Sequence, residues 1–92
     1  MVVVTRHQAF VALAQKRGLV DESSVVVAHA SEEALRDQDV LSSGLPLHLA
    51  ALCRTVTTVP LDLPAELRGR ELTLEECERY AGPTTRYQVT VV

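Results

Sequence analysis

The sequence predicts an α/β domain built on a mostly parallel sheet. Short runs rich in valine recur along the chain, and segments whose apolar residues have helical spacing separate them. Glycine, proline and serine mark the boundaries between these segments. Strands that alternate with helices in this way favour a parallel sheet with helices packed on it. The 92 residues suffice for one core, so we expect a single domain over residues 1–92.

The first part of the chain predicts a strand, a helix and a second strand. Residues Met1–Val4 are a continuous apolar run, typical of a strand that is buried on both faces. Over His7–Arg17 the apolar residues are spaced for one buried helical face, and Gly18 stands where a helix-terminating glycine belongs. The run Ser24–Ala28 predicts a second buried strand.

The middle of the chain predicts two more strands. Glu32–Arg36 is expected to form one or two helical turns, and Asp39–Ser42 the third strand. A helix is expected over Pro46–Arg54, with proline in its first turn. The fourth strand is expected over Thr55–Leu61, and Pro60 indicates that it ends there or lies at a sheet edge.

The last third of the chain predicts a loop, a helix and an edge strand. The loop is expected over Asp62–Arg70. The letters TLEE form a capping box at the start of a helix over Thr73–Tyr80, with Leu72 and Cys77 spaced as its hydrophobic staple. Arg86–Val92 alternates like an edge strand.

Composition limits the classes of partner. Aromatic residues make up only 3% of the chain, so the core is thin, and we expect a homodimer that buries further apolar surface. The net charge of −3 argues against binding of DNA or long RNA, which depends on many Lys and Arg contacts to phosphate. A local basic site remains open, because eight of the nine basic residues are arginines, which suit phosphate oxygens.

The cysteines and the hydropathy pattern indicate a reduced, cytoplasmic protein. Cys53 and Cys77 lack the spacing of a metal knuckle, and we expect both to be buried thiols. The chain opens with no signal peptide, and no apolar run is long enough to cross a bilayer. We therefore expect a cytoplasmic protein with no membrane partner, no cofactor and no metal.

Polar residues follow each of the first four predicted strands. If these strands are parallel, their carboxyl ends share the sheet edge where ligands bind in open α/β sheets. The residues that this places together are Thr5, Arg6, His7, His29, Ser42, Ser43, Gly44 and Asp62.

Two of these groups have both a functional and a structural interpretation. The Ser42-Ser43-Gly44-Leu45 turn precedes a helix, so its N–H groups could bind an anion, or a serine could simply cap the helix. Arg6 and His7 could hold a phosphate and move a proton. The alternative is a solvated arginine beside a histidine in the first helical turn.

The other candidates are equally open. His29 is either part of the site or a half-buried histidine at the sheet edge, and His48 is expected at the surface. The three histidines have no zinc-binding spacing. Arg68 and Arg70 could clamp an anionic ligand, or could be solvated loop charges.

Four segments resemble a family of small CRISPR-associated accessory proteins of type III systems. They are VVVTRHQA, VVAHA, DVLSSGLPLHLAALC and, most specifically, LDLPAELRGRELTLEE, and together they span most of the chain. The chain differs from the family pattern at Gln8 and Ala9, where a Pro-Gly-like pair is common, and in the turn Ser42–Leu45.

The resemblance implies a Rossmann-like, three-layer fold related to CARF domains, and the activity of a ring nuclease. Such an enzyme cleaves cyclic tetra-adenylate to linear di-adenylate with a 2′,3′-cyclic phosphate, without a metal, as a homodimer. We expect Arg6, His7 and Ser43 to be catalytic. The expected ligand-binding residues are Thr5, His29, Ser42, Gly44, Leu45, Arg68 and Arg70. The alternatives are a cyclic oligoadenylate binder without turnover, and a structural dimer that joins other CRISPR components.

Overall fold

A computed structural model describes all 92 residues, and its strands and helices alternate along most of the chain. The strands are β1 (Val2–Val4), β2 (Val25–Val27), β3 (Asp39–Ser42), β4 (Thr55–Thr58) and β5 (Thr85–Tyr87). The helices are α1 (Gln8–Lys16), α2 (Glu32–Leu35), α3 (Leu47–Ala50), the 3-10 turn η1 (Ala65–Leu67) and α4 (Leu74–Tyr80).

All five strands form one sheet in the order β2-β1-β3-β4-β5. The first four strands are parallel, as predicted, and only β5 runs antiparallel to its neighbour β4. Strand β1 lies between two partners, so that Val4 is beside Val27 on one side and Ser42 on the other. The carboxyl ends of β1, β2 and β3 therefore meet at one sheet edge.

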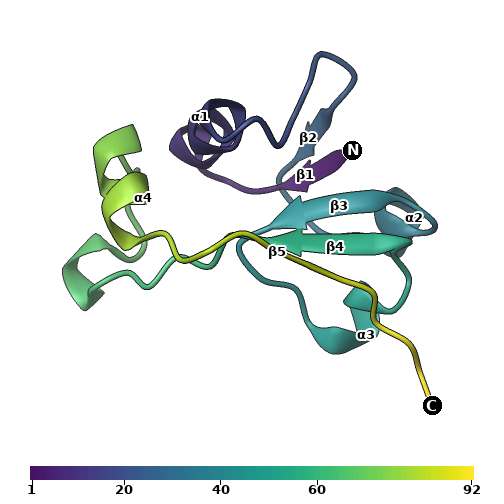
Figure 1. The fold of residues 1–92 in the computed structure, drawn as a ribbon. Coiled ribbons are helices and arrows are strands. Elements are labelled where there is room, and N and C mark those ends of the chain that lie inside the picture. The colour runs from purple at the N-terminus through teal and green to yellow at the C-terminus, as the bar shows by residue number, and fades with distance from the viewer.

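Helices cover both faces of this sheet, which gives the predicted three-layer, Rossmann-like α/β fold (Figure 1). The connection from β1 to β2 and the connection from β2 to β3 run in opposite directions across the sheet. Because parallel crossovers are right-handed, the helices of these two connections lie on opposite faces. Helices α1 and α4 share one face, and α2 and α3 lie on the other.

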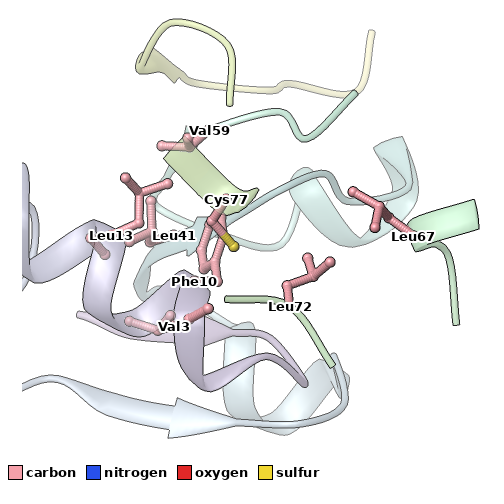
Figure 2. Close-up of a cluster of buried hydrophobic side chains, with 10 residues drawn as sticks. Val3, Phe10, Leu13, Leu41, Val59, Leu67, Leu72 and Cys77 are labelled. Atoms are coloured by element: carbon pink, nitrogen blue, oxygen red, sulfur yellow. The ribbon is translucent and has the colours of Figure 1, made fainter. Parts of the chain in front are cut away.

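The larger part of the core lies between the sheet and helices α1 and α4 (Figure 2). Phe10, at 1% exposure, is the only phenylalanine of the chain, and it packs with Val3 and Leu41 of the sheet and with Cys77 of α4. The same cluster includes Leu67 and Leu72, which flank the loop before α4. This packing holds the loop against the first helix.

The second core cluster is smaller and lies on the opposite face. It consists of Leu35, Val40, Ala50, Cys53 and Val56. Val40 belongs to this cluster while its neighbour Leu41 belongs to the first, because successive side chains of a strand point to opposite faces. Both cysteines are buried free thiols, as predicted.

The predicted helix signals at two positions are confirmed. Gly18 has a φ of +70°, the left-handed conformation that ends a helix at low cost for glycine. At the start of α4 the Thr73 hydroxyl accepts a hydrogen bond from the N–H of Glu76, and the Glu76 carboxylate accepts one from the N–H of Thr73. Leu72 and Cys77 are both buried in the first core cluster, as expected for a staple.

Four predicted features differ in detail from the structure. Strand β2 is not buried on both faces: it is an edge strand that pairs only with β1, and Val25 and Val26 are 59% and 48% exposed. Strand β4 ends at Thr58 and not at Leu61; it stops before Pro60, as one of the two alternatives held, and lies inside the sheet instead of at an edge. Strand β5 covers only Thr85–Tyr87 of the predicted edge strand, and Pro46 precedes α3 instead of lying in its first turn.

One polar contact joins the first residues of β3 and β4. The Asp39 carboxylate accepts hydrogen bonds from Arg54, at 3.1 Å and 2.5 Å, and from the Thr55 hydroxyl at 2.6 Å. These hydrogen bonds from Arg54 and Thr55 hold the pKa of Asp39 far below its usual range. The ionised carboxylate therefore stabilises the folded chain.

We expect Phe10→Ala to lower the free energy of unfolding by about 3 to 5 kcal/mol, because it removes the largest side chain of the core and leaves a cavity. Urea denaturation followed by circular dichroism measures this change. Val25→Ala at the exposed face of β2 is the control, and we expect a far smaller effect. Similar losses in the two variants would contradict the assigned core.

We expect Asp39→Asn to destabilise the protein at neutral pH and to have less effect in acid. The pKa of Asp39 is lower in the folded than in the unfolded chain, so its stabilisation is present above the ordinary aspartate pKa of about 4 and is lost as the pH falls below it. Urea denaturation of both proteins across that range measures the difference. Asp62→Asn, at a carboxyl without a hydrogen bond, is the control.

Candidate functional site

The sheet has a topological switch point between β1 and β3, where the chain connections leave in opposite directions. In open α/β sheets, ligands bind outside the carboxyl ends of the strands at this point. Thr5, Arg6 and His7 follow β1 there, and Ser42 ends the neighbouring β3. The position of the predicted site therefore coincides with the usual ligand-binding position of such sheets.

Arg6 and His7 each line two cavities on the face that carries α1. The first cavity, of about 300 Å³, lies over β2 and is lined by Thr5, Arg6, His7, Gln8, Val11, Val26 and Ala28. The second, of about 350 Å³, is lined only by Arg6, His7, Gly69, Arg70 and Glu71. The second cavity thus combines two guanidinium groups, an imidazole and a carboxylate, with no apolar residue.

Arg6 is held at the carboxyl end of β2 by His29. Its Nη2 lies 3.0 Å from Nδ1 of His29. Because a guanidinium can only donate, Nδ1 of His29 accepts the hydrogen bond and the ring proton is on Nε2. The structure thereby brings together two residues that the sequence places 23 positions apart, and it fixes the direction of the Arg6 side chain.

His7 precedes α1 and has a different environment. Its main-chain N–H donates a 3.1 Å hydrogen bond to the Thr5 hydroxyl. Its side chain does not cap the helix, and its Nδ1 is buried without a hydrogen-bond partner. Only Nε2 is therefore available to a ligand in the cavities.

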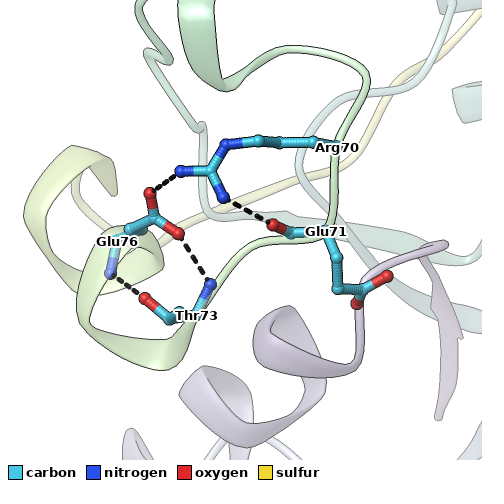
Figure 3. Close-up of polar contacts among 4 residues, drawn as sticks. All are labelled: Arg70, Glu71, Thr73 and Glu76. Atoms are coloured by element: carbon cyan, nitrogen blue, oxygen red, sulfur yellow. Dashed lines mark hydrogen bonds and ion pairs between the residues drawn. The ribbon is translucent and has the colours of Figure 1, made fainter.

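The loop before α4 places Arg70 and Glu71 opposite Arg6 and His7. Gly69 has a φ of +80°, a conformation that other residues rarely adopt, and this turn directs the next two residues to the cavity. The Arg70 guanidinium donates to the Glu76 carboxylate and, at 3.2 Å, to the carbonyl of Glu71 (Figure 3). Arg70 is therefore pre-positioned at the base of α4.

The Glu76 carboxylate that holds Arg70 is itself stabilised in its ionised form. The hydrogen bond from the N–H of Thr73 and the positive charge of Arg70 hold the pKa of Glu76 below its usual range. The loop's other arginine, Arg68, donates to the carbonyl of Leu63 at 3.2 Å and lines neither cavity. Of the two arginines predicted as a clamp, the structure brings only Arg70 to Arg6.

The structure does not bring the Ser42–Leu45 turn into these cavities. Ser42 is 2% exposed, and its hydroxyl donates to the carbonyl of Gly44 at 2.9 Å and accepts from the N–H of Gly44 at 3.0 Å. Ser43, Gly44 and Leu45 line a separate, largely apolar cavity of about 340 Å³ on the opposite face. Helix α3 has no side-chain cap, so the serine-cap interpretation is wrong.

The remaining chemistry-bearing residues lie outside the cavities. No group of three or more His, Cys, Asp or Glu residues is arranged to hold a metal ion. Burial raises the pKa of the Cys53 and Cys77 thiols, and a protonated thiol is a poor nucleophile. His48 is exposed on α3, and none of the helices has the length and apolar character needed to cross a bilayer.

One charged cavity residue was not predicted from the sequence. Glu71 lies next to Arg70 in the loop and lines the second cavity. The sequence offers one signal for Glu71, its place beside Arg70 in the LRGREL segment. Its place beside His7 depends on contacts between segments more than 60 residues apart, which no spacing rule predicts.

Together these features define a Rossmann-like α/β protein with cavities lined by arginine and histidine at the switch point of the sheet. The chain belongs to the family described as "Putative CRISPR-associated protein (Cas_VVA1548)", whose model matches residues 2–90. No curated protein and no solved structure matches the chain. Family membership confirms the CRISPR association that the four sequence segments implied.

We expect inorganic phosphate to bind at the Arg6 cavities and not at the apolar cavity on the opposite face. Nuclear magnetic resonance titration should shift the amide signals of Arg6, His7 and Arg70, because guanidinium groups suit phosphate oxygens. The signals of Leu47 and Tyr87, which line the apolar cavity, should stay in place. Shifts that survive in Arg6→Ala would contradict this site.

Proposed function

We propose that this protein is a metal-independent ring nuclease that opens cyclic tetra-adenylate, a second messenger of type III CRISPR defence. Membership of the CRISPR-associated family and the resemblance of its segments to ring nucleases support this substrate. The observation that carries the proposal is the position of Arg6 and His7 between two cavities at the switch point, with Arg70 across one of them. This set of groups suits a phosphodiester.

The reaction needs no nucleophile from the protein. The 2′-hydroxyl of one ribose attacks the adjacent phosphorus in line, the 2′-oxygen forms a bond to phosphorus, and the 5′-oxygen of the next nucleotide leaves. The protein positions the ribose and stabilises the charge on the phosphoryl oxygens. Arg6 and Arg70 stabilise this charge, and Nε2 of His7 exchanges a proton with the reacting oxygens.

Two such cuts release linear di-adenylate with a 2′,3′-cyclic phosphate and end the signal. Ser43 has no part in this scheme, because it lines a different cavity from Arg6 and His7. His29 acts through Arg6, whose guanidinium it orients.

A homodimer is part of the proposal. The cavities of about 300 and 350 Å³ are at the small end of the range for ligand sites, and a ring of four nucleotides extends beyond them. A second copy related by two-fold symmetry would supply the remaining contacts.

We expect Arg6→Ala and His7→Ala each to slow cleavage of cyclic tetra-adenylate by at least about a hundredfold while the fold is retained. Arg6→Ala removes a positive charge that stabilises the phosphoryl oxygens, and His7→Ala removes the group that transfers the proton. The assay incubates purified protein with the cyclic nucleotide in excess EDTA and follows products by chromatography and mass. Circular dichroism confirms that each variant is folded.

Arg86→Ala is the matched control, because Arg86 is an exposed arginine on β5 that lines no cavity. Its cleavage rate should equal that of the wild type. Near-wild-type rates in both site variants would overturn the assignment. Intact ligand that elutes with the wild-type protein would instead indicate a binder without turnover, and intact unbound ligand a structural role.

A further inference from the structure

The second cavity contains a carboxylate that the proposed reaction has not used. Glu71 lines it together with Arg6, His7, Gly69 and Arg70. The Glu71 carboxylate makes no hydrogen bond or ion pair within the chain, whereas Arg70 beside it donates to both the Glu76 carboxylate and the Glu71 carbonyl. Figure 3 shows the Glu71 side chain turned away from Arg70 and toward the purple N-terminal segment. A free carboxylate thus faces the same space as the histidine.

Transfer of a phosphoryl group to a 2′-hydroxyl requires two proton movements. One group must take the proton of the attacking hydroxyl, and another must give a proton to the leaving oxygen. His7 alone offers one available nitrogen, because its Nδ1 is buried. The cavity therefore needs a second group that can exchange protons, and Glu71 is the only other one that lines it, since the arginines stay protonated.

We propose that Glu71 is the general base of the reaction and His7 the general acid; this inference depends on the proposed ring nuclease function. Glutamate carboxyls are ordinarily ionised at neutral pH, which suits the acceptor of the first proton. The 2′-hydroxyl gives its proton to the Glu71 carboxylate as the 2′-oxygen bonds to phosphorus. The bond from phosphorus to the 5′-oxygen breaks, and that oxygen takes the Nε2 proton of the His7 imidazolium, which becomes a neutral imidazole. Exchange with water then restores both groups.

The surroundings of Glu71 fit this role. Arg6 and Arg70 line the same cavity and are placed to hold the phosphoryl oxygens between the two proton carriers. Glu76 offsets the charge of Arg70 from the far side, so Arg70 does not need Glu71 as its partner. The left-handed turn at Gly69 fixes the direction of the loop. The main-chain carbonyl of Glu71 is itself held by Arg70, which limits movement of the residue.

The first test compares Glu71→Gln with the wild type in single-turnover cleavage of cyclic tetra-adenylate in excess EDTA. Glutamine keeps the size and hydrogen bonding of the side chain but cannot act as a base. We expect a loss of at least about a hundredfold in the rate constant and little change in the dissociation constant of the ligand. If Glu71 only positions His7, glutamine should preserve most of the rate, and that result would overturn the proposal.

The pH profile gives a second readout. The titratable and charged groups that line the cavity with Glu71 are His7, Arg6 and Arg70. Protonation of a general base stops the reaction, so the wild-type rate should fall on the acid side, and this fall should be absent in Glu71→Gln. An unchanged acid limb in the variant would assign the base to another group. Glu75→Gln, at an exposed carboxylate of α4 outside the cavities, is the matched control.

The third test separates the two proton carriers. A cyclic tetra-adenylate with one bridging 5′-sulfur has a leaving group that departs without a proton. Cleavage at this position should be restored in His7→Ala and should remain slow in Glu71→Gln. Restoration in Glu71→Gln alone would reverse the roles and overturn the proposal. Absence of cleavage by the wild type would overturn the ring nuclease function itself, whereas wild-type cleavage with an unaffected Glu71→Gln would overturn only the role of Glu71.

Discussion

The structure depends on the position of β1 between two parallel neighbours. Hydrogen bonding to β2 on one side and to β3 on the other places this strand inside the sheet, and the chain leaves it at the topological switch point. The three residues that follow, Thr5, Arg6 and His7, have to cross the sheet edge before α1 can pack on the face. Strand pairing thus places the arginine and the histidine at the ligand position before any side-chain contact is considered.

The second constraint is the packing of α1 against α4 through Phe10 and Cys77. Leu67 and Leu72 lie at the two ends of the loop between η1 and α4, and both are buried in the same cluster. Gly69–Glu71 therefore faces the segment after β1. Because the core has so few aromatic residues, a small number of side chains provides most of the packing between α1, α4 and the loop. The apolar packing and the geometry of the polar cavity are therefore coupled, and damage to the first is expected to open the second.

The distribution of charge explains how a chain with a net charge of −3 can have a cavity lined by two arginines. Three of the seven basic residues away from the cavities form ion pairs: Lys16 with Glu78, Arg36 with Glu32 and Arg54 with Asp39. Arg6 instead contacts only a neutral histidine nitrogen, and Arg70 shares one carboxylate that is already engaged in a capping box. Arg6 and Arg70 therefore bring two positive charges to the lining of one cavity.

The sequence by itself determined the fold class, the alternation of elements, the capping box at Thr73 and the candidacy of Arg6 and His7, because these follow from local periodicity and residue chemistry. Tertiary structure decided what local patterns do not encode. The runs VVV in β1 and β2 look alike, yet only strand order makes one interior and the other an exposed edge. Arg6 and Ser43 line cavities on opposite faces of the sheet, whereas Glu71 and His7 line the same cavity. Both outcomes depend on which face of the sheet each connection covers, and contacts between distant segments decide that.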